Sequence, residues 1–295
     1  MLSDIGKTRE VDEDSILAVP IKHIKKSKMR EVCLLIVADG LGGHQKGEEA
    51  SNIATDSIFR ECSQELPNST QYNLILEKGI QRANQDILAY ATEHPEATGM
   101  ATTSVCAIVE GNNVVLANVG DSRAYRISND GEINRITKDH SFVQELVDQE
   151  RLNKDEAREH PRKNEITRAV GLSSSLEVDT MKLTLDSDES LLLCCDGVND
   201  HLTDDEIQKI VCDLPNPQDA CQEIVDMANG KGGLDNISLI ILSAEKERVR
   251  SKVHHMYKKH SGRSVEELTP DEKAFREKVE SSDPPQDSIK SPSNE

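Results

Sequence analysis

The sequence lacks any long apolar run. In this chain of 295 residues, runs such as Leu191–Cys195 and Ile237–Leu242 are far shorter than the ~20 residues that a membrane-spanning helix needs. The first residues show no basic segment followed by an apolar block, so no secretory signal is expected. These two absences lead us to expect a cytoplasmic protein without a membrane anchor.

Positive charge is also in short supply. Lys and Arg number 35 against 54 Asp and Glu, which gives a net charge of -19. A protein of this charge is repelled by nucleic acid and by anionic membranes, so we expect neither as a partner. The carboxylates can hold divalent cations, although on charge alone a role in solubility is the simpler interpretation.

The cysteines and histidines show no spacing typical of a zinc site. None of the seven Cys forms a C-x-x-C pair, and the nine His give no H-E-x-x-H. An odd number of Cys without a disulfide framework favours reduced thiols in a reducing compartment. No Cys is followed six positions later by Arg, which excludes a cysteine phosphatase.

Two other phosphate chemistries are disfavoured by their motifs. Gly42 and Gly47 have P-loop spacing, but Glu48 occupies the lysine position and would repel phosphate. The segment that begins at Gly120-Asp121 lacks the second glycine of a nucleophile elbow. An aspartyl-phosphate mechanism through Asp12-Glu13-Asp14 stays open.

The composition changes near residue 244. We therefore predict one domain over residues 1–243 and a charged, largely disordered tail over residues 244–295. The tail begins with the basic segment Lys246–Arg263 and ends in an acidic stretch rich in Pro and Ser, which cannot bury a core. The basic segment is interpreted as a solvated helix, with a docking site for an acidic partner as the alternative.

Apolar spacing predicts packed sheets flanked by helices. Apolar residues recur at helical spacing over residues 50–62 and 76–91, and short runs rich in Val, Ile and Leu predict strands between them and beyond. Gly111-Asn112-Asn113 and Asn129-Asp130-Gly131 are typical hairpin turns. Hairpins argue against a purely parallel sheet and favour an α+β arrangement.

Acidic residues recur where apolar runs begin or end. Apolar runs lead into Asp39-Gly40, Gly120-Asp121 and Asp196-Gly197, while Asp235 and Glu13-Asp14 each precede one. Strand ends at one edge of a sheet lie close together, so these carboxylates are expected to converge. Converging carboxylates repel one another unless protons or cations neutralise them. Oxygen ligands favour Mg²⁺, Mn²⁺ or Ca²⁺, and paired ions are a known arrangement for displacement at phosphorus.

At these residues the chain resembles the type 2C class of metal-dependent serine/threonine protein phosphatases, especially bacterial and archaeal members. The matching segments occur in the order that the family has, and they cover residues 3 to about 243. They begin at Ser3-Asp4, Arg9, Glu13-Asp14, Ala38-Asp39-Gly40, Gly99-Met100, Val119-Gly120-Asp121, Asp139-His140-Ser141, His160-Pro161, Thr167-Arg168, Cys195-Asp196-Gly197 and Gly233-Leu234-Asp235-Asn236.

The resemblance implies a fold and a metal site. The fold is a central β-sandwich of two mostly antiparallel sheets with helices on both outer faces. Two Mn²⁺ or Mg²⁺ ions are implied, with a third, weaker ion as an open possibility. By resemblance, Asp39 bridges two ions, Gly40 offers its carbonyl oxygen, and Asp196 and Asp235 complete the first ion. The remaining implied positions are Asp121 with Asp196 at the third ion, and Glu13, Asp14 and Asp200 beside metal-bound water.

The resemblance also implies hydrolysis of phosphoserine and phosphothreonine in proteins by a metal-bridging water, without a phosphoenzyme. Arg9 matches the arginine that holds the substrate phosphate, and His44 is a candidate general acid. Residues 141–170 match a flap beside the site. The implied partners are phosphorylated proteins and an opposing Ser/Thr kinase, and the chain is expected to act as a monomer. The alternatives are a non-catalytic phosphoprotein-binding module of the same fold and a phosphohydrolase for small molecules.

Overall fold

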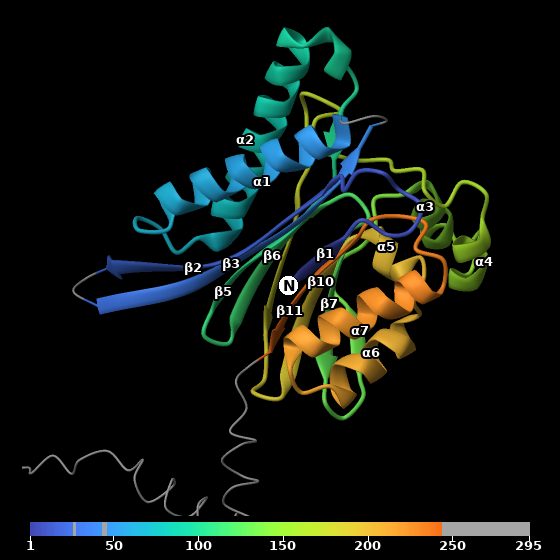
Figure 1. Cartoon of the computed structure of the whole chain (residues 1–295). Helices are drawn as coiled ribbons and strands as arrows, with labels where there is room; N and C mark the ends of the chain where they lie inside the picture. Colours follow the sequence, from blue (N-terminus) through green and yellow to red (C-terminus); the bar gives the residue numbers. More distant parts are fainter. Residues whose placement is uncertain (26–27, 43–45, 244–295) are drawn as a thin grey trace, which may run out of the picture. The chain divides into compact units, whose positions relative to one another are not determined.

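The computed structural model describes residues 1–25, 28–42 and 46–243 (Figure 1). The chain divides into two compact units, Met1–Glu245 and Lys246–Glu295. The predicted tail, with its basic segment, lies outside the described residues. The described helices are α1 Lys46–Glu65, α2 Tyr72–Glu93, the 3₁₀ turn η1 Pro95–Ala97, α3 Phe142–Asp148, α4 Lys154–Glu159, α5 Asp196–Asn199, α6 Asp204–Asp213 and α7 Pro217–Gly230.

Within the described residues, eleven strands form two sheets in which every pairing is antiparallel. One sheet has the order β1-β11-β10-β7-β8, and the other has the order β2-β3-β5-β6-β9 with β4 paired to β3. The predicted pair of antiparallel sheets is therefore confirmed. The strands are β1 Leu2–Asp4, β2 Asp14–Lys25, β3 Lys28–Leu41, β4 Ala101–Thr102, β5 Ser104–Glu110, β6 Asn113–Val119, β7 Arg123–Ser128, β8 Ile133–Arg135, β9 Asp179–Thr184, β10 Glu189–Cys194 and β11 Ile237–Ser243.

Three apolar layers hold the sandwich together. Leu35, Val105 and Leu193 belong to the layer between the two sheets. The outer face of the β2–β9 sheet packs against α1 and α2, and the outer face of the other sheet packs against α6 and α7 (Figure 1). Strands buried on both faces read as near-continuous apolar runs, which is why β5, β6 and β10 could be located from the sequence.

Side-chain caps fix where several helices begin. The Ser141 hydroxyl accepts a hydrogen bond from the backbone N–H of Gln144 at the start of α3, as its position in the sequence predicts. Capping boxes at Asn153 and Thr203 begin α4 and α6. Each cap satisfies backbone donors that would otherwise lack a partner, so these starts are encoded locally.

Two features differ from the sequence-based interpretation. Asp39-Gly40 does not follow a strand: β3 continues to Leu41, because Gly40 and Leu41 pair with β4. Asp196-Gly197 does not directly follow a strand either: β10 ends at Cys194, and Asp196 is the first residue of the short helix α5. Within the described ranges, no helix is both apolar enough and long enough to cross a bilayer.

Candidate metal centre

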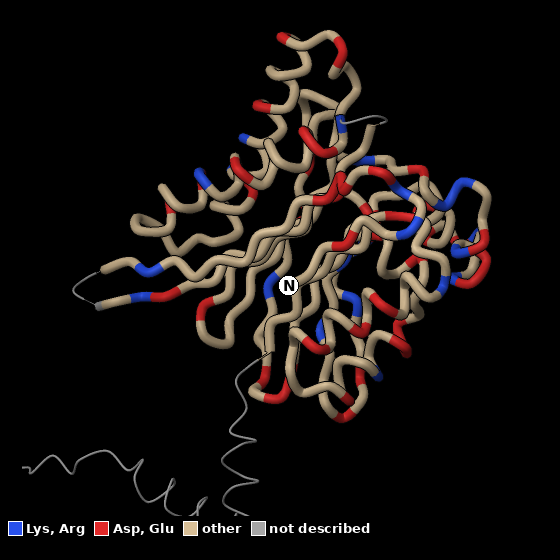
Figure 2. The backbone as a smooth tube through the Cα atoms, viewed as in Figure 1, with Lys and Arg blue, Asp and Glu red and all other residues tan. Residues whose placement is uncertain are grey.

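Acidic side chains from both sheets meet at one end of the sandwich. Asp14, the first residue of β2, pairs across the sheet with Asp39 of β3. Asp121 lies in the turn between β6 and β7, and Asp196 and Asp235 lie at the ends of β10 and β11 in the other sheet. Figure 2 shows acidic segments gathered at the end of the sandwich next to α3 and α4. The expected convergence of these aspartates therefore occurs.

The electrostatics of Asp39 place it at the centre of this cluster. Burial raises the pKa of Asp39 well above its usual value, and the nearby charges of Asp14, Asp196, Asp121 and Asp235 raise it further. A carboxylate is destabilised both by loss of water and by like charges close to it. Four acidic neighbours acting on one buried carboxylate mean that the cluster is unstable in its fully ionised form unless cations are bound.

The neighbours of Asp39 are perturbed in the same direction. Burial raises the pKa of Asp14 to about 8, and the charge of Asp12 adds to this. Burial raises the pKa of Asp196 to about 7, with further contributions from Asp200 and Asp235. Groups with these pKa values hold protons near neutral pH when no cation is present. A divalent ion that binds here must displace those protons.

Unsatisfied oxygens show that the cluster suits a cation. Among the described residues, four buried carboxylate oxygens have no hydrogen-bond donor: Glu13 Oε1, Asp14 Oδ1 and Oδ2, and Asp121 Oδ1. Leaving a buried charged oxygen without a partner costs more than about 1–3 kcal/mol. Oxygen atoms of this kind are the ligands that Mg²⁺ and Mn²⁺ prefer. The residues present therefore fit hard divalent cations.

Cys195 lies within this group but does not make it a zinc site. Ligand atoms of Asp14, Asp39 and Cys195 lie within 4.8 Å of one another. Burial raises the pKa of the Cys195 thiol well above its usual value, and the charge of Asp14 adds to the effect. The thiol donates to the Asn236 carbonyl oxygen and its sulfur accepts from the Ser238 N–H at 3.1 Å. A protonated thiol is a poor metal ligand, so the oxygen atoms define the site.

Arg9 lies at the mouth of the cluster and is held there by two carboxylates. Its Nη2 donates to Asp235 Oδ2 at 2.7 Å, and its Nη1 lies 3.5 Å from Glu13 Oε2. The hydrogen bond to Asp235 raises the pKa of Arg9, and burial opposes this. The Arg9 side chain is still 45 % exposed, so it is accessible from solvent beside the acidic cluster. The predicted proximity of Arg9 to these aspartates is found.

Asn236 has a structural role that the sequence reasoning missed. This side chain is almost fully buried and its Nδ2 donates to the carbonyl oxygens of Ile5 and Val11 at 2.9 and 3.0 Å. Its Oδ1 accepts from the Glu13 N–H at 2.9 Å. Asn236 thereby ties the N-terminal segment, which carries Arg9 and Glu13, to the start of β11. The signal in the sequence was the pair Asp235-Asn236 directly before an apolar strand.

Threonine hydroxyls fix the backbone of Asp39. The Asp39 N–H donates to Thr103 Oγ1 at 3.0 Å, and the Asp39 carbonyl oxygen accepts from the Thr102 hydroxyl and the Thr103 N–H, each at 2.8 Å. Thr103 Oγ1 also lies 2.7 Å from Ser122 Oγ. Thr102 and Thr103 thus form hydrogen bonds next to the site. Asp39 and Asp121 are consequently held in one connected network.

Two glycines allow backbone segments to approach closely at the site. A Cβ on Gly40 would lie 2.2 Å from the Gly47 carbonyl oxygen, and a Cβ on Gly197 would lie 1.9 Å from the Asn236 carbonyl oxygen. Both contacts are with backbone, which cannot move aside as a flexible side chain can. The glycines that follow Asp39 and Asp196 are thus required by packing, besides any role of their carbonyl groups.

Asp121 is positioned by a turn that His140 holds on both sides. The Gly120 N–H donates to His140 Nδ1 at 3.0 Å, and the His140 N–H donates to the Gly120 carbonyl oxygen at 2.9 Å. Gly120 adopts a φ of +107°, which favours glycine. Burial lowers the pKa of His140, so the neutral ring with Nδ1 as acceptor is favoured. The sequence showed His140 in a motif, but its contact with Gly120 could not be read from spacing.

A cavity of about 580 Å³ extends from the acidic cluster toward α3 and α4. Asp121, Asp196 and Asp200 line it together with Lys163 of the predicted flap. Lys163 Nζ forms an ion pair of 2.7 Å with Asp200 Oδ2. The flap region therefore contacts the site through this ion pair, whereas His44, the candidate general acid, lies outside the described residues.

The sequence model of the protein phosphatase 2C family matches residues 3–237. The chain belongs to the protein phosphatase 2C family. A relative named serine/threonine phosphatase stp, from Listeria innocua, is 36 % identical over 243 residues, which is 81 % of this chain and 93 % of the relative. Family membership makes the chain a serine/threonine protein phosphatase.

Solved structures of protein phosphatase 2C relatives share the fold. The Mycobacterium tuberculosis phosphatase PstP/Ppp superposes with a TM-score of 0.73 at 31 % identity and covers 83 % of this chain and 97 % of its own. The catalytic domain of PstP in complex with two manganese ions superposes with a TM-score of 0.70 at 30 % identity, covering 81 % of this chain and 94 % of its own. The predicted sandwich with flanking helices is thus the fold of these phosphatases.

Proposed function

We propose that this chain hydrolyses phosphoserine and phosphothreonine in proteins with two Mn²⁺ or Mg²⁺ ions bound at the acidic cluster. The observation that carries the proposal is the convergence of buried carboxylates whose oxygens lack donors within the described residues. A structural relative described as a complex with two manganese ions supports the choice of metal. The proposal is for two ions, and a third, weaker ion beside Asp121 and Asp196 stays a prediction of the family resemblance.

The residues that would hold the ions come from both sheets. Asp39 would bridge them, with Asp196 and Asp235 as further ligands and the Gly40 carbonyl oxygen beside them. When bound, the ions would supply an activated water and neutralise charge on the phosphoryl oxygens. The acidic residues predicted for the third ion and for contacts to ordered water are Asp121, Glu13, Asp14 and Asp200.

The chain's own cationic group orients the substrate. Arg9 presents a planar donor fork that matches two phosphate oxygens, and Asp235 with Glu13 holds that fork at the cluster. A phosphoryl group bound there would lie next to the acidic cluster that Arg9 contacts through Asp235 and Glu13. In this position the Arg9 fork would also offset negative charge on the departing phosphate.

Replacing Arg9 with alanine is expected to lower kcat/KM by about 10–100-fold, since a charge-assisted hydrogen bond contributes about 1.5–3 kcal/mol. Arg9→Lys should recover part of the loss, because lysine keeps the charge but not the bidentate fork. Steady-state kinetics on a phosphothreonine peptide provide the measurement. Equal kcat/KM for Arg9→Ala and the unmodified enzyme would remove Arg9 from phosphate binding.

The test of the proposed function is an assay of phosphate release from phosphothreonine and phosphoserine peptides. We expect turnover with Mn²⁺, loss of turnover in chelator, and higher kcat/KM on phosphopeptides than on small phosphate esters. Binding of a phosphopeptide without turnover under excess Mn²⁺ would favour the non-catalytic module instead. Higher kcat/KM on small phosphate esters would favour the metabolite phosphohydrolase.

The remaining assignments follow from composition and from the family. The chain is proposed to act as a cytoplasmic monomer that opposes a Ser/Thr kinase on phosphorylated proteins, with a catalytic domain over residues 1–243 and a separate tail from residue 244. All seven cysteines are free thiols, which supports a reducing compartment. The basic segment of the tail and the role of His44 as general acid stay predictions.

A further inference from the structure

Strands β2 and β3 continue past the rest of their sheet as a two-stranded ribbon. β5 pairs with β3 only from Cys33 to Val37, whereas the β2–β3 pairing extends to Lys25 opposite Lys28. The five residue pairs beyond the third strand add about 16 Å at ~3.3 Å per residue. Figure 1 shows this ribbon projecting to the left, past the ends of β5 and β6.

The ribbon has a charge opposite to that of the molecule. Residues 21–32 contain five Lys or Arg and one acidic residue, Glu31, in a chain of net charge -19. Figure 2 shows the basic segments along both strands of the ribbon. The ribbon extends further than the Debye length of about 8 Å at physiological salt. Dissolved salt therefore screens most of the repulsion between the acidic body and an anion at the ribbon tip.

Two large apolar side chains are exposed at the same place. Ile24 and Met29 are direct cross-strand partners, and they are 71 % and 72 % exposed. No other described large apolar side chain exceeds these two values. A single exposed apolar residue is ordinary, but a cross-strand pair within a basic tip calls for an apolar partner. The tip thus combines the two features of an interfacial membrane anchor, which are apolar side chains and flanking lysines.

The base of the ribbon is braced, so the tip is presented in a defined direction. Arg30 donates through two nitrogens to Glu110, and the Tyr72 hydroxyl of α2 donates to Glu110 at 2.9 Å. Val32 is buried in the core layer beneath α1 and α2. Glu110 neutralises Arg30, and Lys22 Nζ lies 3.3 Å from Glu31 Oε2, which leaves Lys25, Lys26 and Lys28 as the positive charge of the tip.

We propose that the tip of the β2–β3 ribbon binds an anionic lipid surface, with Ile24 and Met29 entering the interface and the positive charge of the sequence around them attracting the headgroups. The sequence analysis expects an acidic protein to be repelled by such a surface, and the ribbon is the local exception to that overall charge. A stable protein–protein contact buries about 800 Å² on each partner. A tip with two apolar side chains offers much less area, which favours a lipid surface over a protein partner.

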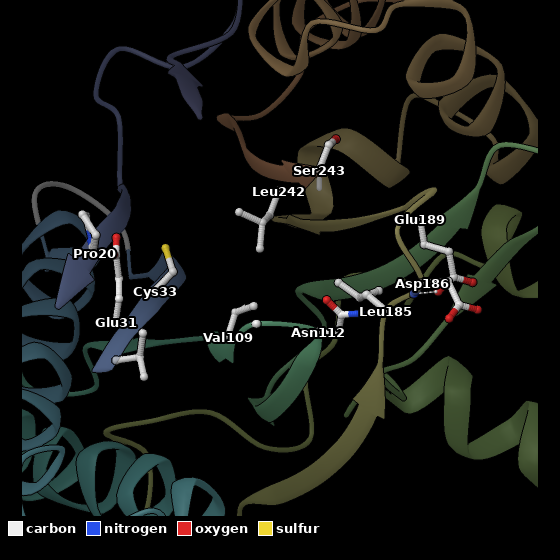
Figure 3. Close-up of a pocket in the computed structure, with 12 residues that line it drawn as sticks. Pro20, Glu31, Cys33, Val109, Asn112, Leu185, Asp186, Glu189, Leu242 and Ser243 are labelled. Carbon is white, nitrogen blue, oxygen red and sulfur yellow. Dashed lines mark hydrogen bonds between the residues drawn. The ribbon is translucent and has the colours of Figure 1, made fainter. Parts of the chain in front are cut away.

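The surroundings of the ribbon limit how far it can enter the lipid. A cavity of about 280 Å³ lies at its base, lined by Pro20 and Cys33 of the ribbon (Figure 3). Glu31, Asp186 and Glu189 also line this cavity and would repel anionic headgroups. Contact is therefore confined to the tip beyond Glu31. The metal centre begins at Asp14, about 36 Å along β2 from Lys25, so it stays open to substrate.

Vesicle co-sedimentation of the full chain tests this proposal. Vesicles of equal parts phosphatidylglycerol and phosphatidylcholine should bind the protein, and phosphatidylcholine alone should not. Replacing both apolar residues, Ile24→Ser with Met29→Ser, should lower the partition coefficient by about tenfold or more. Lys25→Gln with Lys28→Gln should lower it by about 25-fold, since each lysine near an anionic surface contributes about 1 kcal/mol. Added salt should weaken binding of the unmodified chain.

The matched control is Leu74→Ser with Leu172→Ser, which removes two apolar side chains that are 43 % and 53 % exposed elsewhere on the domain. This control should bind vesicles as the unmodified chain does. All variants should retain activity on a soluble phosphopeptide, because none of these residues lies at the metal centre. That readout separates failure of this proposal from failure of the proposed function.

Two results would overturn the membrane proposal. The first is an equal vesicle partition coefficient for the unmodified chain and the ribbon variants. That result would mean that any binding comes from segments other than the ribbon. The second is an absence of vesicle binding together with a ribbon-dependent change in sedimentation velocity, which would identify the tip as a protein interface.

Discussion

Replacing Asp39 with asparagine should lower metal-dependent phosphate release by about 10³-fold or more. Asp39 is the carboxylate on which Asp14, Asp196, Asp121 and Asp235 all act, so it is the position that would bridge the ions. Metal stabilisation of transition-state charge is worth several kcal/mol, and each 1.36 kcal/mol is a factor of ten in rate. Asp196→Asn should give a loss of similar size. Phosphate release at saturating Mn²⁺ is the measurement.

The same substitution should stabilise the metal-free protein. The folded-state pKa of Asp39 is raised, so its ionisation disfavours the native state as pH rises above the unfolded value. A neutral asparagine removes that cost at pH 7. The melting temperature in chelator should therefore rise, by about 2–4 °C for each 1 kcal/mol of relief. Asp188→Asn, an exposed loop position, should change neither activity nor melting temperature.

A fall in both activity and melting temperature would show that Asp39→Asn acts by unfolding the chain. Full activity in the variant would contradict the proposed bridging role outright. A loss of activity together with a rise in melting temperature distinguishes a metal ligand from an aspartate that supports the fold. Acidic residues that support the fold through ion pairs should lower stability when they are removed.

Asn236→Ala should be the most damaging substitution outside the acidic cluster. It leaves the carbonyl groups of Ile5 and Val11 and the N–H of Glu13 without their present partners. The bond to the Glu13 N–H is buried and the two carbonyl contacts are partly buried. A buried group left unsatisfied costs about 1–3 kcal/mol, so a total of about 3 kcal/mol is expected. A domain of this size should then lose roughly 6–12 °C in melting temperature. Activity should fall by about 100-fold, because Arg9 loses its fixed position.

Hydrogen exchange measures this effect where it occurs. Amides of residues 5–13 should exchange faster in Asn236→Ala, while those of β5 and β6 keep their protection. Asn236→Asp should be at least as damaging, because it loses both donors and adds a charge next to the cluster. Asn52→Ala, at an exposed site on α1, is the control and should leave exchange at residues 5–13 unchanged. Unaltered exchange in Asn236→Ala would show that another contact holds this segment.

The sequence allowed the layers and most acidic residues of the site to be predicted because both depend on local patterns. Strands buried on both faces read as apolar runs, and α1 and α2 read as apolar residues at helical spacing. The recurring aspartates could be recognised as a group because each lies beside such a run. Their convergence followed from the general rule that strand ends at one edge lie close together.

The ribbon of β2 and β3 was missed for a physical reason. Beyond Cys33 its residues pair with no third strand, so they carry lysines where a central strand would carry valine. Charged residues and proline are rare in strands. The lysines and Pro20 therefore make the sequence of the ribbon look unlike a strand. The exposure of Ile24 and Met29 could not be inferred from composition.

The contacts that assemble the site were also beyond the sequence. Asn236 binds the N-terminal segment across more than 220 positions, and His140 holds the turn that carries Asp121. Neither contact produces a periodic pattern in the sequence. The pairing of Lys163 with Asp200 likewise depends on how the flap region folds back over the sheet edge. Long-range hydrogen bonds of this kind are set by the tertiary fold.

Equilibrium titration of the metal-free chain with Mn²⁺, followed by electron paramagnetic resonance of the free ion, tests the central claim most directly. We predict saturable binding of two ions per chain at pH 8, weaker binding at pH 6, and loss of the bridged pair in Asp39→Asn. The pH effect has this sign because protons on Asp14 and Asp196, with pKa values of about 8 and about 7, compete with the cation. Absence of saturable binding, or identical binding in Asp39→Asn, would contradict the claim that converging carboxylates form a metal centre.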